Sequence, residues 1–270
     1  SLNKTAKPLA SSENQSDKLV QIKDNILHST QEFPLNLHVN LRLSGQDSPL
    51  KINELAKIHN NNGLTSEYYL SGAFVIEDKT LKLCCNIQEC TLTGEINIEV
   101  RLHNPTAAAH VGGKWDLGDK NSVIVDDFSI IFEYKELQTK LFLKDALSSS
   151  NQLTIENESF TLSQLGSGGE HWESPIHWNE HKQSTVKKQG FHVLKSGGDT
   201  LSGLRAEPTL FVNTEDRFVQ ISLDGFWQNF PAMLKSKKGE SKWQLLSKDT
   251  ELQGGESKTW RFTCVSGNSD

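Results

Sequence analysis

The sequence predicts an all-β protein in which short antiparallel strands form a sandwich or a barrel. Helical periodicity is nearly absent, apolar and polar residues alternate in many segments, and turn-forming residues separate those segments. Residues 94–104 illustrate the alternation: Ile96 and Ile98 fall on one face of a strand, and Asn97 and Glu99 fall on the other. Such strands are stable only when sheets pack together, which favours a sandwich or barrel architecture.

Further strand candidates extend along most of the chain. They cover residues 71–87 (two strands around Glu77–Lys79), 122–134, 140–146, 153–165, 208–214, 217–227, 242–247 and 258–265. Two short segments have helical spacing instead. These are Leu50–Asn60 and the turns around Phe230–Lys235, where Pro231 suits a first helical position.

Composition limits the protein classes. The 270 residues are 35% hydrophobic and carry a net charge of −6, whereas a nucleic-acid binder normally has a basic face. No apolar run approaches the roughly 20 residues that span a membrane. The polar opening of the chain predicts a flexible leader over 1–20. A composition change near Ser148–Asn151 divides the rest into an N-terminal β-domain over 21–148 and a C-terminal β-domain over 149–270.

The polar opening of the chain and its cysteines bear on location. Ser1 begins a segment of the kind that follows a removed signal or a lipid-anchored Cys, which favours a periplasmic or extracellular protein over the cytoplasmic alternative. The four cysteines are too few for a disulfide framework in a chain of this length. Cys84 and Cys85 are adjacent, so a strand would place them on opposite faces. Buried thiols, or one bridge through Cys90, are the expected states.

The first unusual segment, residues 101–119, is a Gly-rich loop that follows a clean strand. Its Trp115 is a candidate sugar-stacking residue. Asp116 and Asp119 are candidate ligands for a cation such as Ca²⁺. The alternative is a rigid loop whose Asp side chains accept hydrogen bonds from its own amides.

The second unusual segment, residues 166–181, concentrates His and Trp in a loop. Its candidate functional residues are His171, Trp172, His177, Trp178, Asn179 and His181. His177 and His181 have a metal-compatible spacing, but Trp178 stands where a zinc protease has Glu. The alternative is a domain-junction loop with packed Trp and hydrogen-bonded His.

Two further segments complete the set. In residues 224–231, Trp227 with Gln228 and Asn229 forms a candidate sugar-binding platform. The alternative is a corner at the end of a strand with Trp227 in the core. Residues 252–259 contain a Gly-Gly hairpin turn.

These four segments, in this order over residues 30–265, resemble the exo-rhamnogalacturonan lyase and YetA-like family. The resemblance implies a small N-terminal β-barrel followed by an antiparallel β-sandwich and then a large α/α toroid, which this chain lacks. It also implies β-elimination on an anionic, uronate-containing polysaccharide of the rhamnogalacturonan type. We therefore expect this chain to be a non-catalytic scaffold or a substrate-binding part of a polysaccharide lyase, with the toroid as partner.

Residue chemistry supplies the catalytic candidates for such a reaction. Elimination needs a base beside the uronate C5 proton and a group that neutralises the carboxylate. The candidates by residue type are His171, His177, Asn179, His181 and Arg205. No cofactor is required apart from the candidate Ca²⁺.

Two alternative functions stay open: the chain is a free-standing carbohydrate-binding module, or it is a metal-stabilised structural β-module. Six lysines have a charge that favours an anionic glycan, although a solvated surface is the commoner explanation for such residues. They are Lys187, Lys188, Lys235, Lys237, Lys238 and Lys242.

Overall fold

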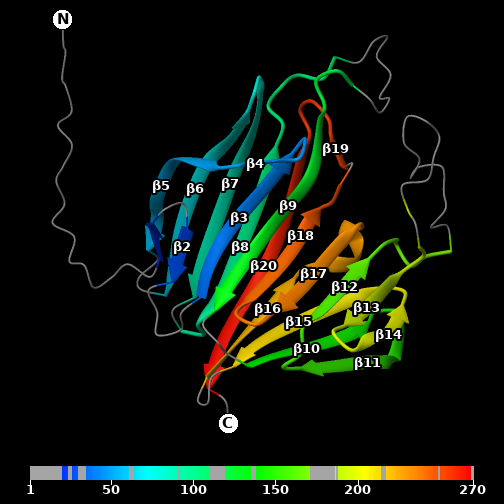
Figure 1. Cartoon of the computed structure of the whole chain (residues 1–270). Helices are drawn as coiled ribbons and strands as arrows, with labels where there is room; N and C mark the ends of the chain where they lie inside the picture. The colour runs from blue at the N-terminus through cyan, green and yellow to red at the C-terminus, as the bar shows by residue number, and fades with distance from the viewer. Residues whose placement is uncertain are drawn as a thin grey trace, which may run out of the picture.

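The computed structural model confirms the all-β prediction (Figure 1). It describes residues 20–23, 26–29, 35–60, 64–90, 92–109, 119–134, 138–170, 186, 188–213, 217–248 and 250–268. Within them the chain forms two antiparallel sheets and one short 3₁₀ helix, η4 (Phe226–Asn229). None of the described helical segments is long and apolar enough to cross a membrane.

The first sheet, sheet A, has eleven strands. Its main path runs through β1 (Val20–Lys23), β2 (Ile26–Ser29), β3 (Leu35–Leu43), β9 (Val123–Tyr134), β18 (Glu240–Leu246), β17 (Ala232–Lys237), β12 (Phe160–Gln164), β13 (Phe191–Lys195) and β14 (Gly198–Gly203). Two short strands lie off this path, β4 (Gln46–Ser48) beside β3 and β19 (Thr250–Leu252) beside β9.

The second sheet, sheet B, has nine strands. Their order is β11 (Ser148–Glu156), β10 (Gln138–Asp145), β15 (Ala206–Asn213), β16 (Arg217–Leu223), β20 (Ser257–Asn268), β8 (Glu95–His103), β7 (Lys79–Cys90), β6 (Thr65–Ile76) and β5 (Leu50–Asn60).

Both sheets combine strands from the two halves of the chain. In sheet A, β9 pairs with β18; in sheet B, β8 pairs with β20 and β10 pairs with β15. The expected boundary at residue 148 coincides with the start of β11, which pairs with β10 before it. The described strands of residues 21–148 form no closed barrel, so the barrel-like arrangement expected there is wrong. Those strands are instead divided between the two sheets of one sandwich.

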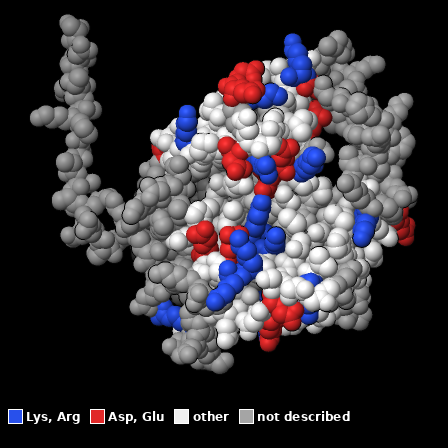
Figure 2. All heavy atoms as spheres, in the orientation of Figure 1, with Lys and Arg blue, Asp and Glu red and all other residues white. Residues whose placement is uncertain are grey.

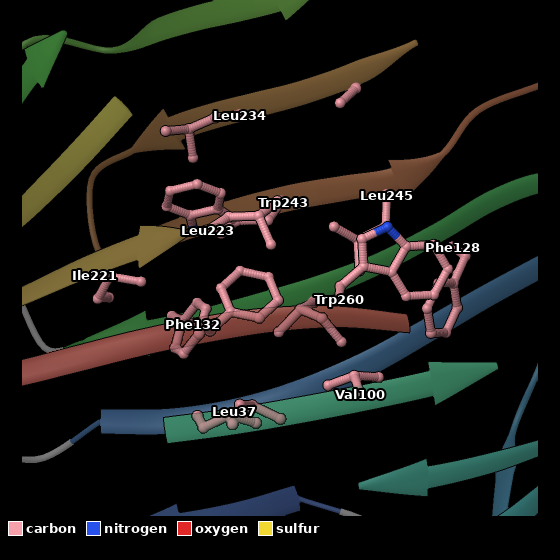
Figure 3. Close-up of a cluster of buried hydrophobic side chains, with 14 of the residues drawn as sticks. Leu37, Val100, Phe128, Phe132, Ile221, Leu223, Leu234, Trp243, Leu245 and Trp260 are labelled. Atoms are coloured by element: carbon pink, nitrogen blue, oxygen red, sulfur yellow. The ribbon is translucent and has the colours of Figure 1, made fainter. Parts of the chain in front are cut away.

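Alternation in the strands places aromatic and aliphatic side chains between the sheets (Figure 3). Trp243 on β18 is fully buried and lies edge-on to Phe262, at 5.6 Å between ring centroids and an interplanar angle of 89°. Its other aromatic neighbour is Phe226 of η4, at 6.2 Å. Edge-to-face contacts of this kind add to the stabilisation from burial. The buried residues of both sheets belong to one continuous hydrophobic cluster.

The two helical expectations are wrong in different ways. Leu50–Asn60 is strand β5, paired along its length with β6, and bulge-like register shifts interrupt the pairing twice. Sheet pairing here overrides a helical spacing in the sequence. The turn expected after Phe230 lies before it, as η4, and Pro231 follows a cis peptide bond that leads into β17.

The prediction that Cys84 and Cys85 lie on opposite faces of a strand is confirmed, and the expectation of buried thiols holds for Cys85 and Cys264 but not for the partly exposed Cys84 and Cys90. Cys85 is buried between the sheets, whereas Cys84 is partly exposed on the opposite face of β7. All four cysteines are free thiols. Burial raises the pKa of Cys85 and of Cys264 to about 12.

Candidate functional site

Most of the sequence-predicted site residues lie outside the described part of the chain. These are Trp115, Asp116, His171, Trp172, His177, Trp178, Asn179 and His181, together with Lys187. The structure does place Asp119, Arg205, Trp227, Gln228 and Asn229. Of these five, it brings Arg205 and Trp227 together and puts Asp119 elsewhere.

Asp119 anchors a loop through backbone amides. One of its carboxylate oxygens accepts a hydrogen bond from Ala109 N at 2.8 Å, and the other accepts one from Asn121 N at 2.8 Å. This geometry matches the loop-anchoring reading of the Asp side chains. In the described residues, no group of three or more His, Cys, Asp or Glu side chains is placed to hold a metal ion.

Asn104 joins the first and the fourth unusual segments. Its side chain is fully buried, and Nδ2 donates to Asn121 O at 2.9 Å and to Leu252 O at 3.1 Å. Its Oδ1 accepts a hydrogen bond from Thr106 N at 3.1 Å. Gly254 packs so tightly against this loop that an added Cβ would lie 2.7 Å from Ala108 N. The two segments therefore form one rigid joint at the end of β8.

Arg205 and Trp227 form a stacked pair at the start of β15. The Arg205 guanidinium carbon lies 4.1 Å from the centroid of the Trp227 ring. Arg205 Nε donates to Ser167 O at 3.0 Å, which fixes the guanidinium above the ring. Phe226, not Trp227, is the buried aromatic of η4.

The two amides after Trp227 differ in their roles. Asn229 Nδ2 donates to Gly225 O at 2.9 Å and so closes the turn on itself. The Gln228 side chain is exposed beside Trp227.

A hollow on the outer face of sheet B is a site that the motif analysis missed. It has a volume of about 460 Å³ and lies over β6, β7, β8 and β20. The strand register aligns one row of its polar residues, with Glu67 opposite Gln88 and Gln88 opposite Asn97. Within this row Gln88 Nε2 donates to Glu67 Oε1 at 3.1 Å.

The neighbouring row of the hollow contains an ion pair. Asn86 lies opposite Glu99, and Glu99 lies opposite Arg261. Arg261 Nη2 is 2.9 Å and Nε 3.0 Å from the same oxygen of Glu99, Oε2. Asp224, at the end of β16, closes this side of the hollow. The side chains of Asn86 and Asp224 have no hydrogen-bond partner among the described residues, so they are open to a ligand.

Tyr69 extends this second row on β6, directly opposite Asn86. Its hydroxyl donates to Cys84 Sγ at 3.4 Å. This hydrogen bond, followed by desolvation, raises the pKa of Tyr69. An aromatic ring therefore lies beside the amides and carboxylates of the hollow.

The outer face of sheet A is polar as well, but its most buried carboxylate, Asp127, already has several hydrogen-bond donors. Asp127 on β9 accepts hydrogen bonds from Ser129 and Lys242, from Gln244 Nε2 at 3.0 Å and from Asn40 Nδ2 at 3.4 Å. Figure 2 shows a band of Lys and Arg side chains over β17 and β18, with Asp and Glu beside it. Four donors to one carboxylate leave little capacity for a ligand here.

Comparison with known proteins gives only weak similarity. No protein-family model and no curated protein matches the chain. A putative aldose 1-epimerase from Escherichia coli K12 is 8% identical over 86% of this chain and 84% of that one, with a TM-score of 0.41. A galactose mutarotase-like protein from Lactobacillus casei ATCC 334 is 9% identical over 92% and 96%, with a TM-score of 0.42. A GH36 α-galactosidase from Geobacillus stearothermophilus is 10% identical over 85% of this chain and 30% of that one, with a TM-score of 0.43. Similarity at this level carries no argument about function.

These comparisons correct the family expectation. No family model matches, and the solved structures that match are described as other kinds of protein, so membership in the exo-rhamnogalacturonan lyase and YetA-like family is wrong. The expected role in a polysaccharide lyase that cleaves rhamnogalacturonan by β-elimination is wrong with it. The expectation of a toroid partner rested only on this resemblance, so no observation supports it. Two of the four segments that carried the resemblance have a structural explanation instead, as the joint around Asn104.

Proposed function

We propose that this chain binds a carbohydrate, whose uncharged part lies in the hollow on the outer face of sheet B. The observation that carries the proposal is the set of planar polar side chains that neighbouring strands direct into one hollow of about 460 Å³. That volume is within the roughly 300–1,000 Å³ typical of small-molecule sites.

The chemistry of the lining suits a sugar. Amides offer both donors and acceptors, and carboxylates and guanidinium groups add strong acceptors and donors, so together they match adjacent hydroxyl groups. Ile87 and Ile98 border the hollow only through their backbone, because their side chains are buried in the core between the sheets.

Charge favours an uncharged group in the hollow itself. The lining contains three carboxylates, Glu67, Glu99 and Asp224, and one guanidinium, Arg261. Arg261 is already paired with Glu99. A uronate carboxylate in this hollow would face uncompensated negative charge, whereas a neutral polyol gains hydrogen bonds without that repulsion.

A titration of the protein with a panel of neutral mono- and disaccharides tests this proposal. We expect saturable chemical-shift changes at residues of β7 and β8, and a loss of affinity of about tenfold for Gln88→Ala, equal to about 1.4 kcal/mol. Gln46→Ala is the matched control, because Gln46 is an exposed glutamine on β4 of the other sheet. Absence of saturable changes across the panel, or an equal loss in both variants, would contradict the proposal.

A further inference from the structure

Arg205 has a charge that no described carboxylate neutralises. It forms no ion pair with any described residue. The buried Asp145 lies close to its backbone, but Asp145 oxygens accept hydrogen bonds from the amides of Leu147 at 3.0 Å, Leu204 at 2.9 Å and Arg205 at 3.1 Å. Asp145 therefore anchors the chain at this point through backbone groups.

The guanidinium is held in place without a ligand. Trp227 supports one face of its plane at 4.1 Å, and the bond from Nε to Ser167 O leaves the Nη groups as the remaining donors. The loop that provides Ser167 turns through Gly168, which has φ of +70° and where an added Cβ would lie 2.4 Å from Leu204 O. Gly169 follows, and an added Cβ there would lie 3.6 Å from Arg205 Nη2. A donor fixed beforehand loses less conformational entropy when a ligand binds.

A planar guanidinium that lies over an aromatic ring, and whose Nη groups bond to none of the described residues, is suited to bind carboxylate or phosphate through two parallel hydrogen bonds. Both Arg205 and Trp227 are partly exposed, so a solute can reach them.

We propose that Arg205 and Trp227 form an oxyanion-binding subsite, which receives the carboxylate or phosphate group of an acidic sugar. The subsite is chemically complementary to the hollow, whose lining repels anions. It also adjoins the hollow in sequence, because Asp224 lines the hollow and Trp227 follows three residues later. The sugar part of the ligand rests on the proposed function; the oxyanion part does not.

The first test uses small anions and needs no sugar. Inorganic phosphate and acetate are titrated separately into the full chain while the Nε–H resonances of its arginines are followed by NMR. We expect a saturable shift of the Arg205 resonance and no saturable shift of Arg42, an arginine on β3 whose Nη2 donates to Gly45 O at 3.1 Å. A larger affinity for phosphate points to a sugar phosphate as the ligand, and a larger affinity for acetate points to a uronate. No saturable shift at Arg205 with either anion would overturn the subsite, even where neutral sugars still bind in the hollow.

The second test compares D-glucose, D-glucuronate and D-glucose 6-phosphate by calorimetry. We expect at least one acidic sugar to bind about tenfold more tightly than glucose, because charge-assisted hydrogen bonds to Arg are the stronger kind. Arg205→Gln should abolish this preference and Arg42→Gln should keep it. Trp227→Phe should reduce it less than Arg205→Gln does. A preference that survives Arg205→Gln in a protein with an unchanged Tm would overturn the proposal.

Discussion

Two polar regions of the molecule use the same residue types for opposite purposes. Asn104 in the joint is fully buried, and the structure gives it two donor bonds and one acceptor bond to backbone groups. Asn97 in the hollow is exposed, and it bonds only to side chains, Glu95 Oε1 at 2.8 Å and Thr263 Oγ1 at 3.1 Å. A buried amide must keep its partners, whereas an exposed amide exchanges them with water and therefore with a ligand.

The acidic residues repeat this contrast. Asp127 on sheet A is mostly buried and accepts from four donors, among them Lys242. Glu99 on sheet B pairs with one arginine, Arg261, whose side chain is 65% exposed. Polar groups whose hydrogen-bonding capacity is filled by the protein stabilise the fold. The polar groups on sheet B that have fewer partners are available to bind a ligand.

The contrast between the two acids predicts the largest difference in stability. Asp127→Ala leaves the partly buried Lys242 without its counter-ion and should lower the free energy of unfolding by about 3 kcal/mol. Glu99→Ala breaks an exposed ion pair and should cost less than about 1 kcal/mol. Urea unfolding of both variants measures the difference, and sugar titration should show the reverse order of effects on binding. Equal losses of stability would contradict the distinction between the two faces.

Replacing Asn104 or Asn97 should give a smaller difference in stability for the same reason. Asn104→Ala leaves Leu252 O and the Thr106 amide without a partner and should cost about 2 kcal/mol. Asn97→Ala should change stability by less than about 0.5 kcal/mol and should weaken sugar binding instead. Thermal unfolding and calorimetry on the two variants check both halves of this prediction. Loss of binding in a stable Asn104→Ala variant would mean that the joint also takes part in recognition.

Sequence alone predicted the strands well because alternation is a local signal. The alternation in residues 95–103 predicts a solvent-facing side that carries Asn97 and Glu99, and this side forms part of the hollow. The alignment of that face with Gln88 and Arg261 depends on strand order and register, which no local pattern specifies. The pairing of β5 with β6 likewise overrides the helical spacing of residues 50–60.

Motifs were misleading for a related physical reason. Close backbone contacts need Gly, Asn and Asp at fixed positions, so structural joints such as that of Asn104 and Gly254 look unusual in sequence. A flat polar face built from alternate residues of ordinary strands has no such signature. The stacking of Arg205 on Trp227 joins residues 22 positions apart through a turn, and neither residue indicates the other.

The two faces of β7 also differ in their thiols, and this difference predicts a dependence of stability on pH. Burial raises the pKa of Cys85 and Cys264 from 9.0 to about 12. Above pH 9 the unfolded chain loses these protons and the folded chain keeps them, so their contribution to stability is complete below pH 9 and is lost as the pH rises towards 12. The loss is at most about 1.4 kcal/mol per pH unit for each thiol.

Urea unfolding between about pH 8 and about pH 11 measures this slope. Replacing both buried thiols, in Cys85→Val with Cys264→Val, should make the decline less steep. Cys90→Val is the control, because hydrogen bonds with Thr93 lower the pKa of that thiol. A slope that is the same in all three proteins would show that the buried thiols ionise alike in the folded and unfolded chains.

The smallest expected effect concerns the candidate calcium ligand in the joint. Both oxygens of Asp119 already accept backbone hydrogen bonds at 2.8 Å, and a cation there would have to displace them. Calcium should therefore change the Tm very little, whereas a site that binds only the folded state would add about 2.7 kcal/mol at a concentration a hundred times its Kd. Thermal unfolding with added Ca²⁺ and with EDTA distinguishes these cases, with Asp119→Asn as the comparison. A rise in Tm with Ca²⁺ that is lost in Asp119→Asn would make the joint a metal site. The joint would then bind a ligand although its polar groups already have hydrogen-bond partners.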